Sequence, residues 1–165
     1  MKTLHLLAGL VLCGIFVGCA TSTHFTPVTN IPPDKALVYL YRRASQFQGS
    51  AISHEIYVNQ KPVTVIYNNV YYPYLATPGE VQFIGLEKGL GQFALANFVH
   101  SKYTIGQINV EAGKTYYLRY VQAYWKKESN NTSRALLLPV DNEIGAREIT
   151  NCVLAVNLEM NLEER

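Results

Sequence analysis

The sequence predicts an all-β domain: an immunoglobulin-like antiparallel β-sandwich with one short C-terminal helix. Between residues 36 and 140, short apolar runs follow one another at close spacing, with turn-forming residues between them and no interleaved helical pattern. The chain also contains 12 tyrosines and many β-branched residues, and both kinds of side chain favour strands.

The first predicted strand is Ala36 to Arg43, which reads ALVYLYRR. Because strand residues alternate between faces, Leu37, Tyr39 and Tyr41 should share one face and Arg42 should point to the other. Both faces are largely apolar up to the arginines. This pattern is typical of a central strand, which is covered on both sides.

Further strands follow at short spacing. They are predicted at 53–58, 62–67, 70–75, 81–86, 93–99, 105–110, 115–125 and 135–139. Asn, Pro and Gly residues provide the backbone angles for the turns between them, at 59–61, 68–69, 77–80 and 111–114. A polar loop is predicted at 126–133, and a short helix at 142–153 with Asp141 as its N-cap.

The N-terminus has the pattern of a signal peptide. Lys2 is followed by an apolar run from Leu4 to Val17, shorter than the roughly 20 residues that a membrane-spanning helix needs. Residues 15–20, IFVGCA, close this run and place the small Gly18 before Cys19. This stretch resembles the lipobox of bacterial lipoprotein signal peptides; the alternative is an ordinary cleaved signal that leaves Cys19 as a free thiol.

The lipobox resemblance implies a membrane anchor at Cys19. Its thiol would carry diacylglycerol, the chain would be cut before it, and the new amine would take a further acyl chain such as palmitate. In bacteria with two membranes, aspartate after the cysteine is the usual mark for retention in the inner membrane, and here the residue is Ala20. The expected location is therefore the periplasmic face of the outer membrane.

Four segments are expected on this basis. They are a signal peptide at 1–18, a lipidated tether at 19–35, a β-sandwich domain at 36–155 and a frayed tail at 156–165.

Charge and cysteine content restrict the possible functions. The chain has 14 basic and 12 acidic residues, and no basic run is longer than Arg42-Arg43 or Lys126-Lys127, so no nucleic-acid partner is expected. Cys13 would leave with the signal peptide and Cys19 would carry lipid. Cys152 would then be a lone cysteine, and we expect it to be a buried small apolar residue.

Several motifs resemble a family of bacterial lipoproteins classed as a domain of unknown function. The motifs are ALVYLYR at 36–42, TPGE at 77–80, GKTYYLR at 113–119 and LPVDNEIG at 138–145. The resemblance covers roughly Asp34 to Leu154. The part from Glu55 to Ile84 is also similar to the small PEGA-class sandwich domains of envelope proteins. Neither resemblance implies an activity.

No catalytic constellation is recognisable, so we expect no enzyme activity, no catalytic residue, no metal site and no cofactor. His24, His54 and His100 lack the spacing of metal ligands, and His54 and His100 are predicted to be surface residues. A dyad of Cys152 with a histidine has no supporting motif. The glycines at 85–91 indicate a connection between strands rather than a phosphate loop, because no helix is predicted after them.

The candidate contacts for a ligand or partner are arginines and tyrosines near the family-like motifs: Arg42, Arg119, Tyr41, Tyr72 and Tyr117. A guanidinium beside tyrosines can bind a carboxylate. The structural alternative is an ion pair, or stacking of the guanidinium on a nearby tyrosine. The aromatic cluster Tyr67, Tyr71, Tyr72 and Tyr74 could also offer a binding platform, with at least half of it in the core.

The leading hypothesis is a non-enzymatic envelope lipoprotein that acts as an interaction or scaffolding module, with an envelope protein or peptidoglycan as its partner. The second is a binder of a cell-wall or other small acidic ligand through exposed Tyr and Arg. The third is an envelope hydrolase.

Overall fold

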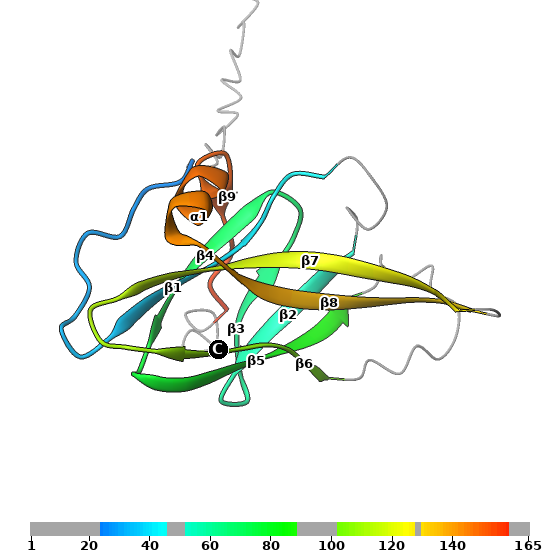
Figure 1. Cartoon of the computed structure of the whole chain (residues 1–165), viewed down its shortest axis with the longest axis horizontal. Coiled ribbons are helices and arrows are strands. Elements are labelled where there is room, and N and C mark those ends of the chain that lie inside the picture. The colour runs from blue at the N-terminus through cyan, green and yellow to red at the C-terminus, as the bar shows by residue number, and fades with distance from the viewer. Residues whose placement is uncertain (1–23, 46–51, 89–101, 128–129, 159–165) are drawn as a thin grey trace, which may run out of the picture.

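The protein is a sandwich of two β-sheets (Figure 1). The computed structural model describes residues 24–45, 52–88, 102–127 and 130–158, without the side chains of 87–88, 124–127 and 130–133. One sheet has five strands in the order β8-β7-β1-β4-β9, and the other has four in the order β3-β2-β5-β6. The predicted β-sandwich is therefore confirmed.

The elements have the following bounds: β1 Ala36–Arg42, β2 Ser53–Val58, β3 Lys61–Ile66, β4 Val70–Ala76, β5 Gly79–Lys88, β6 Tyr103–Val110, β7 Thr115–Lys127, β8 Asn130–Val140, α1 Asn142–Ile149 and β9 Val153–Leu154. No helix in this described part of the chain is long and apolar enough to cross a membrane.

Strand β1 is the centre of the five-stranded sheet, and all seven of its residues are buried, as the sequence predicts. It runs antiparallel to β4 but parallel to β7, in a register from Leu37 opposite Thr115 to Tyr41 opposite Arg119. Strands β4 and β9 are also parallel. The five-stranded sheet is therefore mixed, whereas the sequence analysis expected purely antiparallel pairing.

The predicted turns are present. Asn59 and Gln60 have φ angles of 50° and 67°, so both occupy the left-handed region that a two-residue hairpin between β2 and β3 requires. Asn69, before β4, has a φ of 60°. Gly113 has a φ of 71° in the turn before β7, where a side chain would be strained.

Three boundaries differ from the prediction or cannot be compared with it. The prediction of a polar loop at 126–133 is wrong for most of its length, because β7 continues to Lys127 and β8 begins at Asn130. These residues pair in an antiparallel ladder, and its backbone hydrogen bonds do not depend on the polarity of the side chains. The helix ends at Ile149 rather than at 153, because Val153 pairs with Val70 in β9. The strand expected at 93–99 lies outside the described residues.

The main core lies between the two sheets. Its largest fully buried apolar side chains include Phe83 of β5, Leu40 of β1 and Leu118 of β7. The ring of Phe83 meets that of Tyr74 edge-on, with 6.2 Å between their centroids. This packing determines which side chains of each strand point into the sandwich, and therefore which residues can line a site where two strands separate.

A second apolar cluster covers the outer face of the five-stranded sheet. Tyr39 and Tyr71 belong to it, and the ring of Phe25 packs edge-on against both, with centroids 5.4 Å and 5.1 Å away. The backbone N–H of Val28 donates to the Tyr39 hydroxyl at 2.8 Å, and His24 forms a bridge with Val153. Residues 24–31 are thus packed on the domain, so this part of the predicted tether is not a loose linker.

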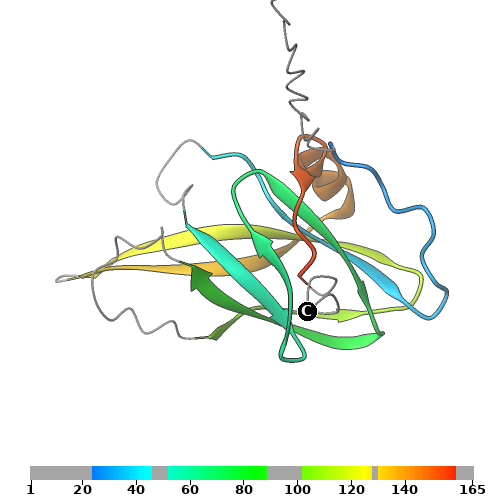
Figure 2. The same ribbon diagram turned by 180° about the vertical axis from the view of Figure 1, so that it is seen from behind.

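Helix α1 covers the same outer face beside this N-terminal segment (Figures 1 and 2). The side chain of Asp141 accepts a hydrogen bond from the N–H of Glu143, as expected for the predicted N-cap. Gly145 lies directly against Tyr117 of β7, and a Cβ at this position would stand 2.4 Å from the Cβ and Cγ of that tyrosine. Glycine therefore allows the helix to lie close to the sheet.

Candidate functional site

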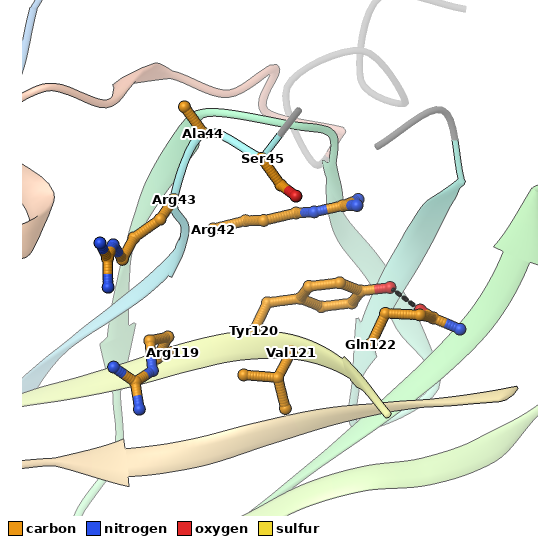
Figure 3. A pocket seen from close by; sticks show the side chains of 8 residues that line it. All are labelled: Arg42, Arg43, Ala44, Ser45, Arg119, Tyr120, Val121 and Gln122. Atoms are coloured by element: carbon orange, nitrogen blue, oxygen red, sulfur yellow. Dashed lines mark hydrogen bonds between the residues drawn. The ribbon is translucent and has the colours of Figure 1, made fainter. Parts of the chain in front are cut away.

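A groove of about 330 Å³ opens where β1 and β7 part (Figure 3). The register between these strands ends at Tyr41 opposite Arg119, while β7 continues to Lys127. The groove is lined by Arg42, Arg43, Ala44, Ser45, Arg119, Tyr120, Val121 and Gln122. It brings together Arg42 and Arg119, two of the candidate contacts predicted from the sequence.

The two predicted arginines enter the groove from opposite faces of the sheet. Arg42 is on the inner face, where its guanidinium lies over the ring of Tyr120 at 4.8 Å from the centroid (Figure 3). It also donates a hydrogen bond to the backbone carbonyl of Ile52. Arg42, whose side chain is buried, therefore makes the tyrosine contact that the structural alternative describes.

Arg119 lies on the outer face and forms an ion pair with Glu148 of α1. Arg119 Nη1 is 3.1 Å and 3.2 Å from the two carboxylate oxygens of Glu148. Two further groups donate to the same carboxylate: Arg43 Nη1 to Oε1 at 3.0 Å and the Tyr41 hydroxyl to Oε2 at 2.7 Å. Arg119 therefore makes the ion pair that the structural alternative describes. The three donors to Glu148 are Tyr41 of β1, Arg43 just after β1 and Arg119 of β7, and they hold α1 against the sheet.

The surroundings of Glu148 shift two pKa values. Burial opposes its ionisation, but the hydrogen bond from Tyr41 and the charges of Arg119 and Arg43 outweigh burial and lower the pKa of Glu148. Burial, together with the hydrogen bond to Glu148, raises the pKa of Tyr41. The carboxylate is therefore ionised and the phenol neutral near pH 7.

A chain of hydrogen bonds connects the groove to the sandwich interior through His54. Tyr120 Oη is 2.6 Å from Gln122 Oε1 and 2.8 Å from His54 Nδ1. The other ring nitrogen, His54 Nε2, is 3.1 Å from Tyr103 Oη. This Tyr103 hydroxyl also accepts a hydrogen bond from the N–H of Ala135. These contacts are satisfied together when Nδ1 carries the proton and donates to Tyr120, and Nε2 accepts from Tyr103.

His54 is fully buried, so the prediction of a surface histidine is wrong. It lies on the same strand face as Ile56 and Val58, and two tyrosine hydroxyls satisfy its ring nitrogens in place of water. Burial, assisted by the charge of Arg42, lowers the pKa of His54 to about 4.

Two donors that line the groove have no hydrogen-bond partner within the described residues. They are Arg119 Nε and Gln122 Nε2, and both atoms are buried. An unpaired buried donor costs about 1 to 3 kcal/mol. An acceptor oxygen on a bound molecule would remove part of this cost.

The predicted tyrosine contacts are mostly structural. Tyr41 and Tyr72 are buried in the outer cluster and the main core respectively, so their prediction as exposed ligand contacts is wrong. Tyr117 is half-buried and stacks on Tyr39, with 5.2 Å between centroids. Tyr71 is buried as well, and Tyr67 is half exposed, so at least half of the predicted aromatic cluster belongs to the cores.

The dyad of Cys152 with His54 is not formed. Cys152 packs in the outer cluster and its Sγ lies 3.6 Å from the backbone oxygen of Arg42, whereas His54 lies on the other side of the sheet. The prediction of a buried cysteine is confirmed, and burial raises the pKa of Cys152 to about 11. Over the same residues, no three His, Cys, Asp or Glu side chains are grouped to hold a metal ion. His100 lies outside them.

The family model for a protein of unknown function, DUF2846, matches residues 32–132. The chain belongs to the DUF2846 family. No curated protein and no solved structure matches the chain. The matched DUF2846 region contains every residue that lines the groove, whereas α1 and Glu148 follow it in the sequence.

Sequence reasoning missed four contributors to the site: Arg43, Ser45, Gln122 and Glu148. The signal for Arg43 was present, because it extends the basic end of an otherwise apolar strand. Nothing in the sequence connects Glu148 with Arg119, because the contact depends on how α1 folds back over β7.

Proposed function

We propose that this DUF2846 protein is a non-enzymatic envelope lipoprotein, anchored by lipid at Cys19 on the periplasmic face of the outer membrane. Its β-sandwich serves as an interaction or scaffolding module for an envelope protein or peptidoglycan. The observation that supports the anchor is the position of the IFVGCA stretch. It ends four residues before His24, the first described residue, which forms a bridge with Val153 of the sandwich. The similarity of 55–84 to PEGA-class domains supports an envelope role.

Replacing Cys19 with alanine is expected to move the protein from the membrane fraction to the soluble fraction. Each buried CH₂ contributes about 0.8 kcal/mol, and two or more acyl chains anchor stably. Fractionation of cells followed by mass spectrometry of the mature chain measures this, and Cys13→Ala is the matched control that should stay in the membrane. An unmodified Cys19 in the wild-type mature chain would contradict the anchor.

A second function, binding of an acidic ligand, is favoured by the groove between β1 and β7. Arg42, Arg43 and Arg119 line it together with two donors that have no partner in the described part of the chain, and Glu148 contacts both Arg43 and Arg119. Guanidinium groups bind carboxylates through charge-assisted hydrogen bonds. The carboxylates of cell-wall peptides fit this chemistry.

Arg43→Gln is expected to weaken retention on purified peptidoglycan about tenfold. A charge-assisted hydrogen bond contributes about 1.5 to 3 kcal/mol, and the lower value, about tenfold in affinity, applies to an exposed side chain. Arg43 is the suitable position because 60% of its side chain is exposed, so its loss should leave the core intact. Lys61→Gln, which removes the same charge at the exposed start of β3, is the control and should bind like the wild type. Absence of wild-type retention would exclude peptidoglycan as the ligand.

A further inference from the structure

Three large apolar side chains are exposed around β9. Tyr67, Leu154 and Val156 have 50%, 49% and 54% of their surface accessible. Ala155, which lies between Leu154 and Val156 in the sequence, is buried. We call these three residues the β9 apolar surface.

The three residues lie on adjoining segments. Leu154 pairs with Tyr71 in the ladder between β9 and β4. The chain then reaches β3, where Thr64 Oγ1 donates to the backbone oxygen of Val156 at 2.7 Å, and Tyr67 begins the loop from β3 to β4. Figures 1 and 2 both show β9 and this loop at the same end of the sandwich, with the β2–β3 hairpin at the opposite end.

The N-terminus joins the domain at this end. His24 forms an antiparallel bridge with Val153, the neighbour of Leu154. Only residues 20–23 separate His24 from Cys19. A fully extended chain spans at most 3.3 to 3.6 Å per residue, so the Cα of Cys19 can lie no more than about 18 Å from that of His24.

A lipid on Cys19 would therefore hold this end of the sandwich close to the bilayer. The polar headgroup region on each side of the hydrocarbon is itself about 5 to 8 Å thick, so residues 19–24 must cross this distance before the chain reaches water. Because the anchor already confines the domain, its second contact acts at high effective concentration and need not be strong. A surface of three side chains, too small to bind a membrane alone, is then sufficient.

We propose that Tyr67, Leu154 and Val156 insert into the bilayer surface and hold the domain in one orientation. The proposal rests on the lipid anchor of the proposed function. Leucine and valine would bury apolar area at the boundary of the acyl chains, and tyrosine would place its ring there and its hydroxyl among the headgroups. The β2–β3 hairpin would point away from the membrane.

The test places a bimane fluorophore on single cysteines in the lipidated full-length mature protein, reconstituted into phosphatidylethanolamine–phosphatidylglycerol vesicles with or without brominated acyl chains. The positions are Leu154→Cys and Val156→Cys at the β9 apolar surface and Lys61→Cys at the β2–β3 hairpin. Val156 is the nearer of the first two to the hairpin, because it contacts Thr64, three residues along β3 from Lys61. Tyr67→Cys, in a loop, serves if a strand variant does not fold. Cys152 is buried with a raised pKa, so protein without an added cysteine gives the labelling background.

Brominated lipid is expected to quench the fluorophore at 154 at least twofold more than at 61, with the quenching at 156 between the two. Equal quenching at the three positions, in protein that mass spectrometry shows to be acylated and that floats with the vesicles, would overturn the membrane contact and leave the anchor standing. An unmodified Cys19 in protein that does not float would overturn the anchor and the contact together.

Discussion

Lowering the pH from 7 to 4 is expected to reduce the free energy of unfolding by about 3 kcal/mol through His54 alone. The pKa of His54 is lowered in the folded protein from its ordinary value of 6.5 to about 4. Below pH 6.5 the unfolded chain takes up a proton that the folded protein does not accept until about pH 4. Stability is therefore lost across this window, at about 1.36 kcal/mol for each unit of pKa shift, and the loss from His54 levels off below about pH 4.

Urea titrations of the wild type and of His54→Gln at intervals from pH 7 to pH 4 measure this loss. Glutamine retains a donor and an acceptor for the hydroxyls of Tyr120 and Tyr103 but does not titrate. The contribution of Glu148, which is also lost as the pH falls, is common to both proteins and cancels in the comparison. Identical pH dependence in the two proteins would show that His54 is not buried as a neutral group.

Strand alternation in the sequence predicts part of this arrangement. It places His54 on the same face as Ile56 and Val58, which the structure confirms. It does not reveal that Tyr103 and Tyr120, from strands 49 and 66 residues further along, supply the hydroxyls that make burial possible. Without these partners, a histidine beside serine and glutamate is reasonably predicted at the surface.

The groove shows the same division between what can and cannot be predicted. The alternation of β1 correctly sends Arg42 and Tyr41 to opposite faces, so the inner and outer sides of the site follow from the sequence. Alternation specifies the face of a residue but not the neighbouring strand. The parallel pairing of β1 with β7, which sets Arg119 beside Tyr41 and opens the groove, depends on long-range packing.

Replacing Glu148 with alanine is expected to reduce the free energy of unfolding by about 2 to 3 kcal/mol. The carboxylate is only 14% exposed and accepts from Tyr41, Arg43 and Arg119. Loss of this acceptor leaves the buried Tyr41 hydroxyl unsatisfied, which costs about 1 to 3 kcal/mol. The two arginines add less, because both are partly exposed to water. Glu148→Gln retains an acceptor and should cost about 1 kcal/mol.

The same glutamine variant should bind an acidic ligand more tightly, because Glu148 competes with that ligand for Arg43 and Arg119. Stability and peptidoglycan retention are thus expected to change in opposite directions, a combination that a simple folding defect does not produce. Glu143→Gln is the matched control: it removes one negative charge from the exposed first turn of α1, and both measurements should stay near the wild type. If Glu148→Gln lowers retention together with stability, Glu148 does not compete with the ligand and the groove is not its binding site.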